Sequence, residues 1–262
     1  MNVFILTGGG SRGALQVGML KKLIELSILP DLIVGISVGS LNGIVIASNP
    51  SLETVNDLEE IWKGVVEKEL FPVNVKQIIA GLGKNNYLVS NSGLKKLISK
   101  SPVRNIEDPK IKFLCVVTNF ETGQSVIFDK GKAEEILLAS CSLPGIFEPV
   151  NIEGQLYVDG GICFLPINEL PGVSSKDTIY ILDASSPIIN LKHNNALSAL
   201  LKSLSMTFKS QFATSRDLDN VYYFGVDKQG NEKLDGKSFS STIELVDKGY
   251  SIVSEVLLKN SR

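Results

Sequence analysis

The chain has 262 residues, of which 44% are hydrophobic and 21% are charged, as in an ordinary globular protein. Its 26 basic and 28 acidic residues give a net charge of -2, which argues against a general nucleic-acid binder and against acidic disorder. No apolar run approaches the ~20 residues needed to cross a bilayer.

Hydrophobic patterning predicts alternating strands and helices, because short apolar runs are followed by segments with helical spacing. The predicted strands are Val3–Leu6, Leu32–Ile36, Lys112–Asn119, Val126–Phe128, Leu156–Val158, Thr178–Asp183 and Val221–Val226. The predicted helices are about Ala14–Leu26, Val38–Ser48, Leu52–Lys68, Leu94–Ser99, Ala133–Ser140, Ala196–Leu218 and Ile243–Leu258. This order implies right-handed crossovers, parallel pairing and one α/β domain over residues 1–262.

Three of these helices have a predicted inward face, which in the last one carries Leu245, Val246, Ile252, Val253 and Val256. In the first, Leu15, Met19, Leu23 and Leu26 share one side. In the third, Ile61 and Trp62 are expected to pack inward.

The three cysteines, Cys115, Cys141 and Cys163, are widely spaced in apolar surroundings and form no Cys-x-x-Cys pair. This pattern predicts buried free thiols of a reducing compartment rather than a zinc site or a disulfide scaffold. The N-terminus also lacks the positively charged region of a signal peptide. We therefore expect a cytoplasmic protein with no bound metal.

The first candidate site is the loop Gly8-Gly9-Gly10-Ser11-Arg12-Gly13, between a predicted strand and a predicted helix. Its backbone N–H groups and the helix dipole favour an anion, either a phosphate or a developing oxyanion. The spacing also fits the dinucleotide fingerprint G-x-G-x-x-G, which expects an acidic residue at the end of the next strand. That strand ends in Gly35-Ile36-Ser37 instead, which disfavours nucleotide binding.

The second candidate site is Gly35-Ile36-Ser37-Val38-Gly39, a G-x-S-x-G sequence at a strand-to-helix junction. Such a nucleophile elbow forces the serine out of the sheet, and Gly35 and Gly39 avoid collisions. The N–H of Val38 begins the helix and can join an oxyanion hole. The alternative is a plain glycine-rich turn with an inert serine.

A nucleophilic serine needs a base, and two candidates are open. The chain order Ser37, Asp159, His193 fits a triad, although His193, the single histidine, lies in a polar loop typical of solvated residues. The other candidate is Asp159 acting directly, with Gly160 and Gly161 leaving room beside its carboxylate. Desolvation would raise the pKa of that carboxylate and strengthen it as a base. An ordinary Asp-Gly turn is the alternative.

Three stretches in this order resemble the motifs of the patatin-like phospholipase family. They are Gly8 to Gly13, Gly35 to Gly39, and Asp159-Gly160-Gly161, and Thr118 to Gly123 and Ala139 to Phe147 also match. The resemblance spans about residues 3 to 255. In many members Asn-x-Pro follows the Asp-Gly-Gly motif, whereas this chain keeps Pro166 and replaces the Asn.

The resemblance implies a three-layer α/β/α sandwich with a mostly parallel sheet and a serine–aspartate dyad that hydrolyses acyl esters of lipids. By it, Ser37 is the nucleophile, Asp159 the base and the Gly8 to Gly10 backbone the oxyanion hole. Arg12 matches the basic position of the first motif and orders that loop or meets a phosphate. No cofactor or metal is implied.

The expected partner is a phospholipid, lysophospholipid or other acyl lipid, met by transient contact with a membrane surface or micelle; no nucleic acid is expected. Residues 69–87 are apolar enough to form a lid or mouth, although core packing is the alternative. Acyl transfer through the same acyl-enzyme stays open, as does a catalytically silent lipid- or nucleotide-binding protein. The ester position and the oligomeric state stay open too.

Overall fold

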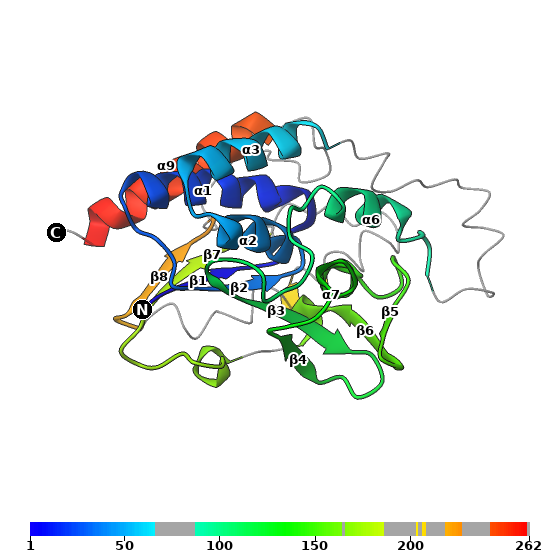
Figure 1. The fold of residues 1–262 in the computed structure, drawn as a ribbon. Coiled ribbons are helices and arrows are strands. Elements are labelled where there is room, and N and C mark those ends of the chain that lie inside the picture. The colour runs from blue at the N-terminus through cyan, green and yellow to red at the C-terminus, as the bar shows by residue number, and fades with distance from the viewer. Residues whose placement is uncertain are drawn as a thin grey trace.

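The computed structural model describes residues 1–65, 87–163, 166–185, 203, 206–207, 218–226 and 242–260 of the chain. In this part, strands and helices build an eight-stranded sheet with helices packed on it (Figure 1). The strands are β1 (Asn2–Leu6), β2 (Leu32–Ile36), β3 (Lys112–Asn119), β4 (Ser125–Phe128), β5 (Val150–Ile152), β6 (Gln155–Asp159), β7 (Thr178–Leu182) and β8 (Val221–Phe224). The helices are α1 (Gly13–Glu25), α2 (Val38–Ser48), α3 (Leu52–Lys63), α6 (Ser92–Ile98), α7 (Ala133–Cys141) and α9 (Thr242–Asn260).

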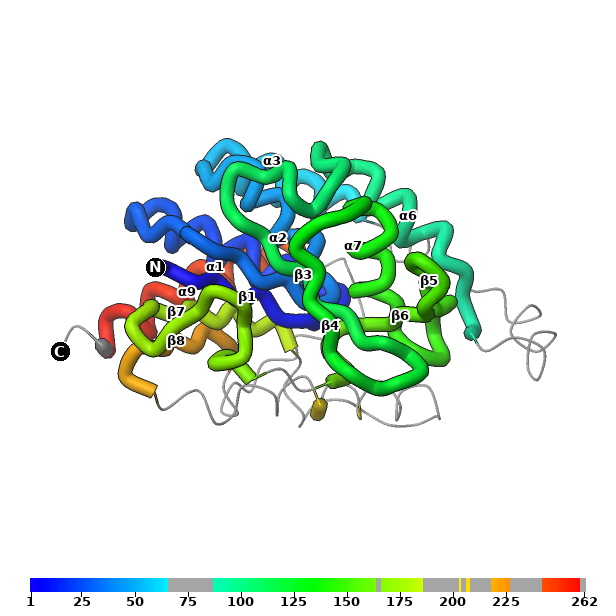
Figure 2. Tube along the Cα trace, turned by 60° about the horizontal axis from the view of Figure 1, so that its bottom comes forward, coloured from blue at the N-terminus to red at the C-terminus, as the bar shows by residue number. Residues whose placement is uncertain are grey.

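The sheet is mixed, with a parallel centre. Its order is β5-β6-β3-β2-β1-β7-β8, and β4 pairs with β3 off this path. Parallel pairs join β3 to β2, β2 to β1, β1 to β7 and β7 to β8. Antiparallel pairs join β3 to β4, β3 to β6 and β5 to β6. Figure 2 shows the two ends of the sheet, with β7 and β8 at one end and β5 and β6 at the other.

Helices α1, α2, α3, α6, α7 and α9 lie on the same side of the sheet (Figure 1). Alternate strand residues face this side, including Phe4, Leu6 and Ile33 in the larger hydrophobic core. The intervening residues, among them Val3 and Ile5, form a second core with Leu170. Because both faces of the sheet are covered, its strands are apolar at successive positions. The architecture is compatible with the three-layer α/β/α fold expected from the sequence.

Most of the predicted strands are confirmed, and so is their parallel pairing at the centre. The sequence analysis missed β5, a three-residue strand that pairs with β6 across a tight turn. Glu153 and Gly154 both take positive φ, of 52° and 86°, as a two-residue hairpin of this kind requires. The helix expected over residues 196–218 lies almost wholly outside the described residues.

Two predictions of inward packing were wrong in detail. Leu26 follows the last residue of α1 and is 46% exposed, because α1 ends at Glu25 and the chain turns toward β2. Helix α1 is instead buried on nearly every side, since α9 and α3 both pack against it. In α3, Trp62 is buried as expected, whereas Ile61 is only half-buried.

The cysteines divide into two kinds. Cys115 and Cys141 are buried free thiols, and burial raises the pKa of Cys115 to about 12. Cys163 is only half-buried, which corrects the expectation for that residue, and its Sγ donates to the Gly123 carbonyl.

Candidate active site

Ser37 is the single residue between the last residue of β2 and the first residue of α2. Its backbone takes φ 53° and ψ −130°, which is costly for a residue with a side chain. The junction is this sharp because α2 lies directly on the end of β1. A Cβ on Gly39 would be 2.1 Å from the Leu6 carbonyl oxygen, so only glycine allows this approach. The G-x-S-x-G sequence therefore forms the sharp strand-to-helix turn that a nucleophile elbow requires, referred to below as the elbow.

Two buried serines hold the main chain of Ser37 in this conformation. The Ser37 N–H donates to Ser140 Oγ at 3.0 Å, and that hydroxyl donates to the Val116 carbonyl at 2.8 Å. The Ser37 carbonyl accepts from the N–H of Ser40 at 2.8 Å and from its Oγ at 2.6 Å. Sequence reasoning did not assign a role to Ser140 or Ser40. Ser140 lies at the end of α7, within the supporting stretch Ala139 to Phe147.

The pairing of β3 brings Ser37 and Asp159 together. Ile36, the last residue of β2, is paired with Val116, and Asp159, the last residue of β6, is paired with Val117. Strand β4 pairs with the same two residues, Val116 and Val117, on the opposite edge of β3. Strands β2 and β6 therefore pair with one and the same edge of β3. Because β2 runs parallel and β6 antiparallel to β3, their carboxyl ends meet head to head. Ser37 and Asp159 lie at that meeting point.

The Asp159 side chain is fully buried. Its Oδ1 accepts from the Gly161 N–H at 2.9 Å, whereas Oδ2 makes no regular hydrogen bond within the described part of the chain. Burial raises the pKa of Asp159 to about 7; the neighbouring Ser37 side chain and then the Gly161 N–H act against this rise. Oδ1 is thus hydrogen-bonded to the backbone, while Oδ2 is the oxygen able to accept a proton.

The strand segment around Asp159 is fixed by two further contacts. The Asp159 N–H donates to the Ser142 carbonyl at 2.9 Å, and Thr118 Oγ1 donates to the Asp159 carbonyl at 3.0 Å. Gly160 begins the short 3₁₀ turn η2 (Gly160–Ile162), where a Cβ would be 2.2 Å from the Val116 carbonyl oxygen. The two glycines after Asp159 therefore let the chain pack against β3 and return an N–H to the carboxylate.

The glycine loop lies beside the elbow, since Leu6 at the end of β1 is paired with Gly35 of β2. Gly8 is buried, Gly9 is half-buried and Gly10 is exposed, so the surface of the loop is bare backbone. Gly10 takes φ 56°, and a Cβ there would meet nothing within 4 Å. The loop then forms the 3₁₀ turn η1 (Gly10–Arg12) and enters α1 at Gly13. The loop thus places exposed backbone at the end of β1, beside the β2 end that leads into Ser37.

Arg12 lies beneath this loop and is only 2% exposed. Its Nε donates to the Ala184 carbonyl at 3.3 Å, just beyond the end of β7, while its two terminal nitrogens make no hydrogen bond with the residues that the structure describes. Desolvation lowers the pKa of Arg12, and the nearby charge of Asp183 opposes that change. This contact links the loop to the chain just after β7.

Two other predictions fall outside these contacts. His193 lies outside the described residues. The apolar stretch 69–87 also lies outside them, apart from Tyr87. In the part of the chain that the structure describes, we find no helix both long and apolar enough to span a bilayer. No group of three or more His, Cys, Asp or Glu side chains that could hold a metal ion occurs among the same residues.

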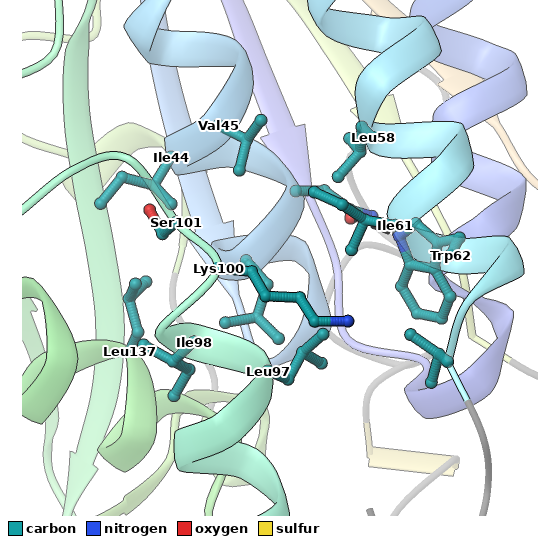
Figure 3. A pocket seen from close by; sticks show the side chains of 13 residues that line it. Ile44, Val45, Leu58, Ile61, Trp62, Leu97, Ile98, Lys100, Ser101 and Leu137 are labelled. Carbon is teal, nitrogen blue, oxygen red and sulfur yellow. Dashed lines mark hydrogen bonds between the residues drawn. The ribbon is translucent and has the colours of Figure 1, made fainter.

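A small apolar cavity lies behind the elbow, between α2, α3, α6 and α7 (Figure 3). It begins at Leu41, one turn after Ser37, and Lys100 lies over it. Its volume is about 30 Å³, the space of one water molecule. An acyl chain therefore does not fit into this cavity as it stands.

The fold and the site define the class of protein. It is an α/β protein whose strand-to-helix turn places a serine beside a buried carboxylate and a glycine loop. Residues 4–171 match the family model described as patatin-like phospholipase, and the chain belongs to that family.

Curated relatives include two fungal proteins. Lysophospholipase nte1 of Aspergillus niger is 28% identical over 191 residues, which cover 70% of this chain and 12% of the fungal protein. Lysophospholipase NTE1 of Scheffersomyces stipitis is 29% identical over 186 residues, 68% of this chain and 11% of that protein. The chain thus spans about an eighth of the length of these relatives.

Among solved structures, VipD from Legionella pneumophila matches with a TM-score of 0.55. The match covers 98% of this chain and 67% of VipD at 14% identity. At this identity the likeness concerns the fold.

Proposed function

We propose that this chain is a serine lipid acyl hydrolase that cleaves the fatty-acyl ester of lysophospholipids or phospholipids. Membership of the patatin-like phospholipase family and the lysophospholipase relatives support this substrate class. The observation that carries the proposal is the register on β3, where the ends of β2 and β6 meet and oppose Ser37 to the buried carboxyl of Asp159.

In the proposed reaction, Asp159 accepts the hydroxyl proton of Ser37 as Oγ attacks the ester carbonyl. A pKa of about 7 suits this step, because a general base works best when its pKa is near the working pH. The tetrahedral intermediate collapses, the bond to the glycerol oxygen breaks, and Asp159 returns the proton to that oxygen. Water then attacks the acyl-enzyme, gives its proton to Asp159 and releases the fatty acid, and Ser37 regains its proton.

The negative oxygen of both tetrahedral intermediates would be stabilised by the backbone N–H groups of Gly9, Gly10 and Val38. The first N–H groups of α2 have no partner inside the helix, so Val38 has a donor available. Loss of one such donor typically costs ~10²- to 10³-fold in rate.

We further propose that residues 1–262 act as one catalytic domain, because strands from both halves of the chain share the sheet. A substrate in a micelle or bilayer would be met by transient contact with that surface. The buried Arg12 would act through the loop that it ties to β7, since its Nε is bonded to Ala184.

The test is the release of palmitate from 1-palmitoyl-lysophosphatidylcholine micelles, identified by mass spectrometry. Ser37→Ala should lower the rate by ~10³-fold or more, as loss of a nucleophile does. Ser48→Ala is the matched control, because Ser48 ends the same helix and its Oγ donates to the Ile44 carbonyl of that helix. Unchanged palmitate release by Ser37→Ala would overturn the proposal, and an acyl ester of an added alcohol as the main product would indicate a transferase.

A further inference from the structure

Two buried amide side chains join the two ends of the glycine loop. Gln16 of α1 donates from Nε2 to the Thr7 carbonyl at 2.8 Å and to the Leu182 carbonyl at 3.0 Å. Asn42 of α2 donates from Nδ2 to the Gly13 carbonyl at 3.0 Å. Thr7 immediately precedes the loop and Gly13 is its last residue, so Gln16 and Asn42 are hydrogen-bonded to the two ends of the loop.

The two amides also bind each other. Asn42 Nδ2 donates to Gln16 Oε1 at 2.9 Å, and Asn42 Oδ1 accepts from Trp62 Nε1 at 2.8 Å. Gln16 is 0% exposed and Asn42 is 1% exposed, so water does not compete for these groups. Both donors of each amide and both amide oxygens are used. A buried polar network that is satisfied in this way makes its surroundings rigid and specifies one arrangement.

The same network reaches the elbow through packing. A Cβ on Gly13 would be 2.5 Å from Trp62 Cζ2 and 2.6 Å from Val38 Cγ2. The first residue of α1, the first residue of α2 and the Trp62 ring are therefore in close contact. Figure 3 shows Trp62 on α3, at the edge of the small cavity. A change at Asn42 or Gln16 would shift the loop relative to Val38.

We propose that Gln16 and Asn42 are positioning residues that hold the N–H groups of the glycine loop at the distance from Ser37 that an oxyanion requires. This inference rests on the proposed hydrolase function. Neither side chain contacts the substrate, so both act through the loop backbone. A displacement of about 1 Å at a catalytic group costs on the order of 10²-fold in rate.

The experiment compares Gln16→Met, which keeps length without hydrogen bonds, and Asn42→Asp, which keeps the acceptor for Trp62 and leaves at most one O–H donor in place of two N–H donors. We expect kcat for lysophospholipid hydrolysis to fall ~10- to 100-fold with KM within about threefold. The pH profile set by Asp159 should not move, because neither residue contacts that carboxyl. Asn91→Leu is the control, since it removes another buried amide, bonded to the Glu148 carbonyl.

Hydrogen exchange of residues 8–13 supplies a readout that does not depend on activity. Faster exchange of these amides in Gln16→Met and Asn42→Asp, but not in Asn91→Leu, supports the positioning role. This holds even where wild type releases no fatty acid, because that outcome would overturn only the hydrolase proposal. Wild-type activity combined with unchanged kcat and unchanged exchange in folded Gln16→Met and Asn42→Asp would overturn the positioning role alone. A fall in kcat that Asn91→Leu reproduces at equal loss of stability would overturn it as well.

Discussion

Asp159→Asn should stabilise the protein while removing its activity, and the gain in stability should depend on pH. The native carboxyl keeps its proton up to a pH of about 7, whereas the unfolded one ionises near 3.8. Between these values the native state binds more protons, so the free energy of unfolding of wild type falls as pH rises. The full difference corresponds to about 4 kcal/mol. Asparagine does not titrate, and its Oδ1 can still accept from the Gly161 N–H.

The assay is urea unfolding of wild type and Asp159→Asn at pH 5, 6, 7 and 8. The advantage of the variant should grow by about 3 kcal/mol between pH 5 and pH 8, and then level off. Asp177→Asn is a control of opposite sign, because the Met1 amine lowers the pKa of Asp177. Its loss of stability at neutral pH should shrink as pH falls. A gain in Asp159→Asn that is equal at pH 5 and pH 8 would refute the reasoning about the buried carboxyl.

Three further outcomes follow from individual contacts. Ser140→Ala leaves the Ser37 N–H and the Val116 carbonyl without their partner; it should cost about 1–3 kcal/mol in urea unfolding and lower kcat, and an unchanged kcat would count against the elbow's dependence on Ser140. Gly39→Ala places a Cβ 2.1 Å from the Leu6 carbonyl oxygen and should cost about 3 kcal/mol, with loss of fluorophosphonate labelling; normal stability would contradict the close approach of α2 to β1. Val45→Ile adds one methyl group to the cavity of about 30 Å³ and should raise the free energy of unfolding by up to about 0.7 kcal/mol, whereas a loss of more than 1 kcal/mol would mean that the cavity cannot take it.

The sequence predicts the parts of the site that depend on local geometry. A short apolar run followed by Gly-x-Ser-x-Gly requires a strand, a sharp turn and a helix, and the structure contains all three around Ser37. The glycine loop after β1 follows from the same reasoning. Parallel pairing of β1 and β2 then places the glycine loop and Ser37 together at the carboxyl ends of these strands.

The approach of Asp159 to Ser37 does not follow from local pattern. It depends on the registers of β2 and β6 on β3, which are set by long-range packing rather than by spacing along the chain. The three-residue β5 is too short for a periodic signal, and its Glu153-Gly154 turn was the available clue. From residues alone, Asp159 therefore could not be told from an ordinary turn aspartate, and the family resemblance supplied the assignment.

Buried polar residues are the other features that the sequence analysis did not find. Gln16 and Asn42 are residue types that usually lie at the surface, so composition does not mark them as buried. Burial there arises because α9 and α3 cover α1, which only the fold reveals. Leu26 was a wrong prediction for another reason, since α1 ends at Glu25 and Leu26 lies beyond the helix.

The most direct measurement of the central claim is the site of covalent modification by a fluorophosphonate probe, mapped by peptide mass spectrometry. The proposed dyad predicts one adduct, on Ser37, that disappears in Ser37→Ala, becomes much slower to form in Asp159→Asn and persists in His193→Ala. An adduct on another residue, or loss of labelling in His193→Ala with full labelling in Asp159→Asn, would contradict it.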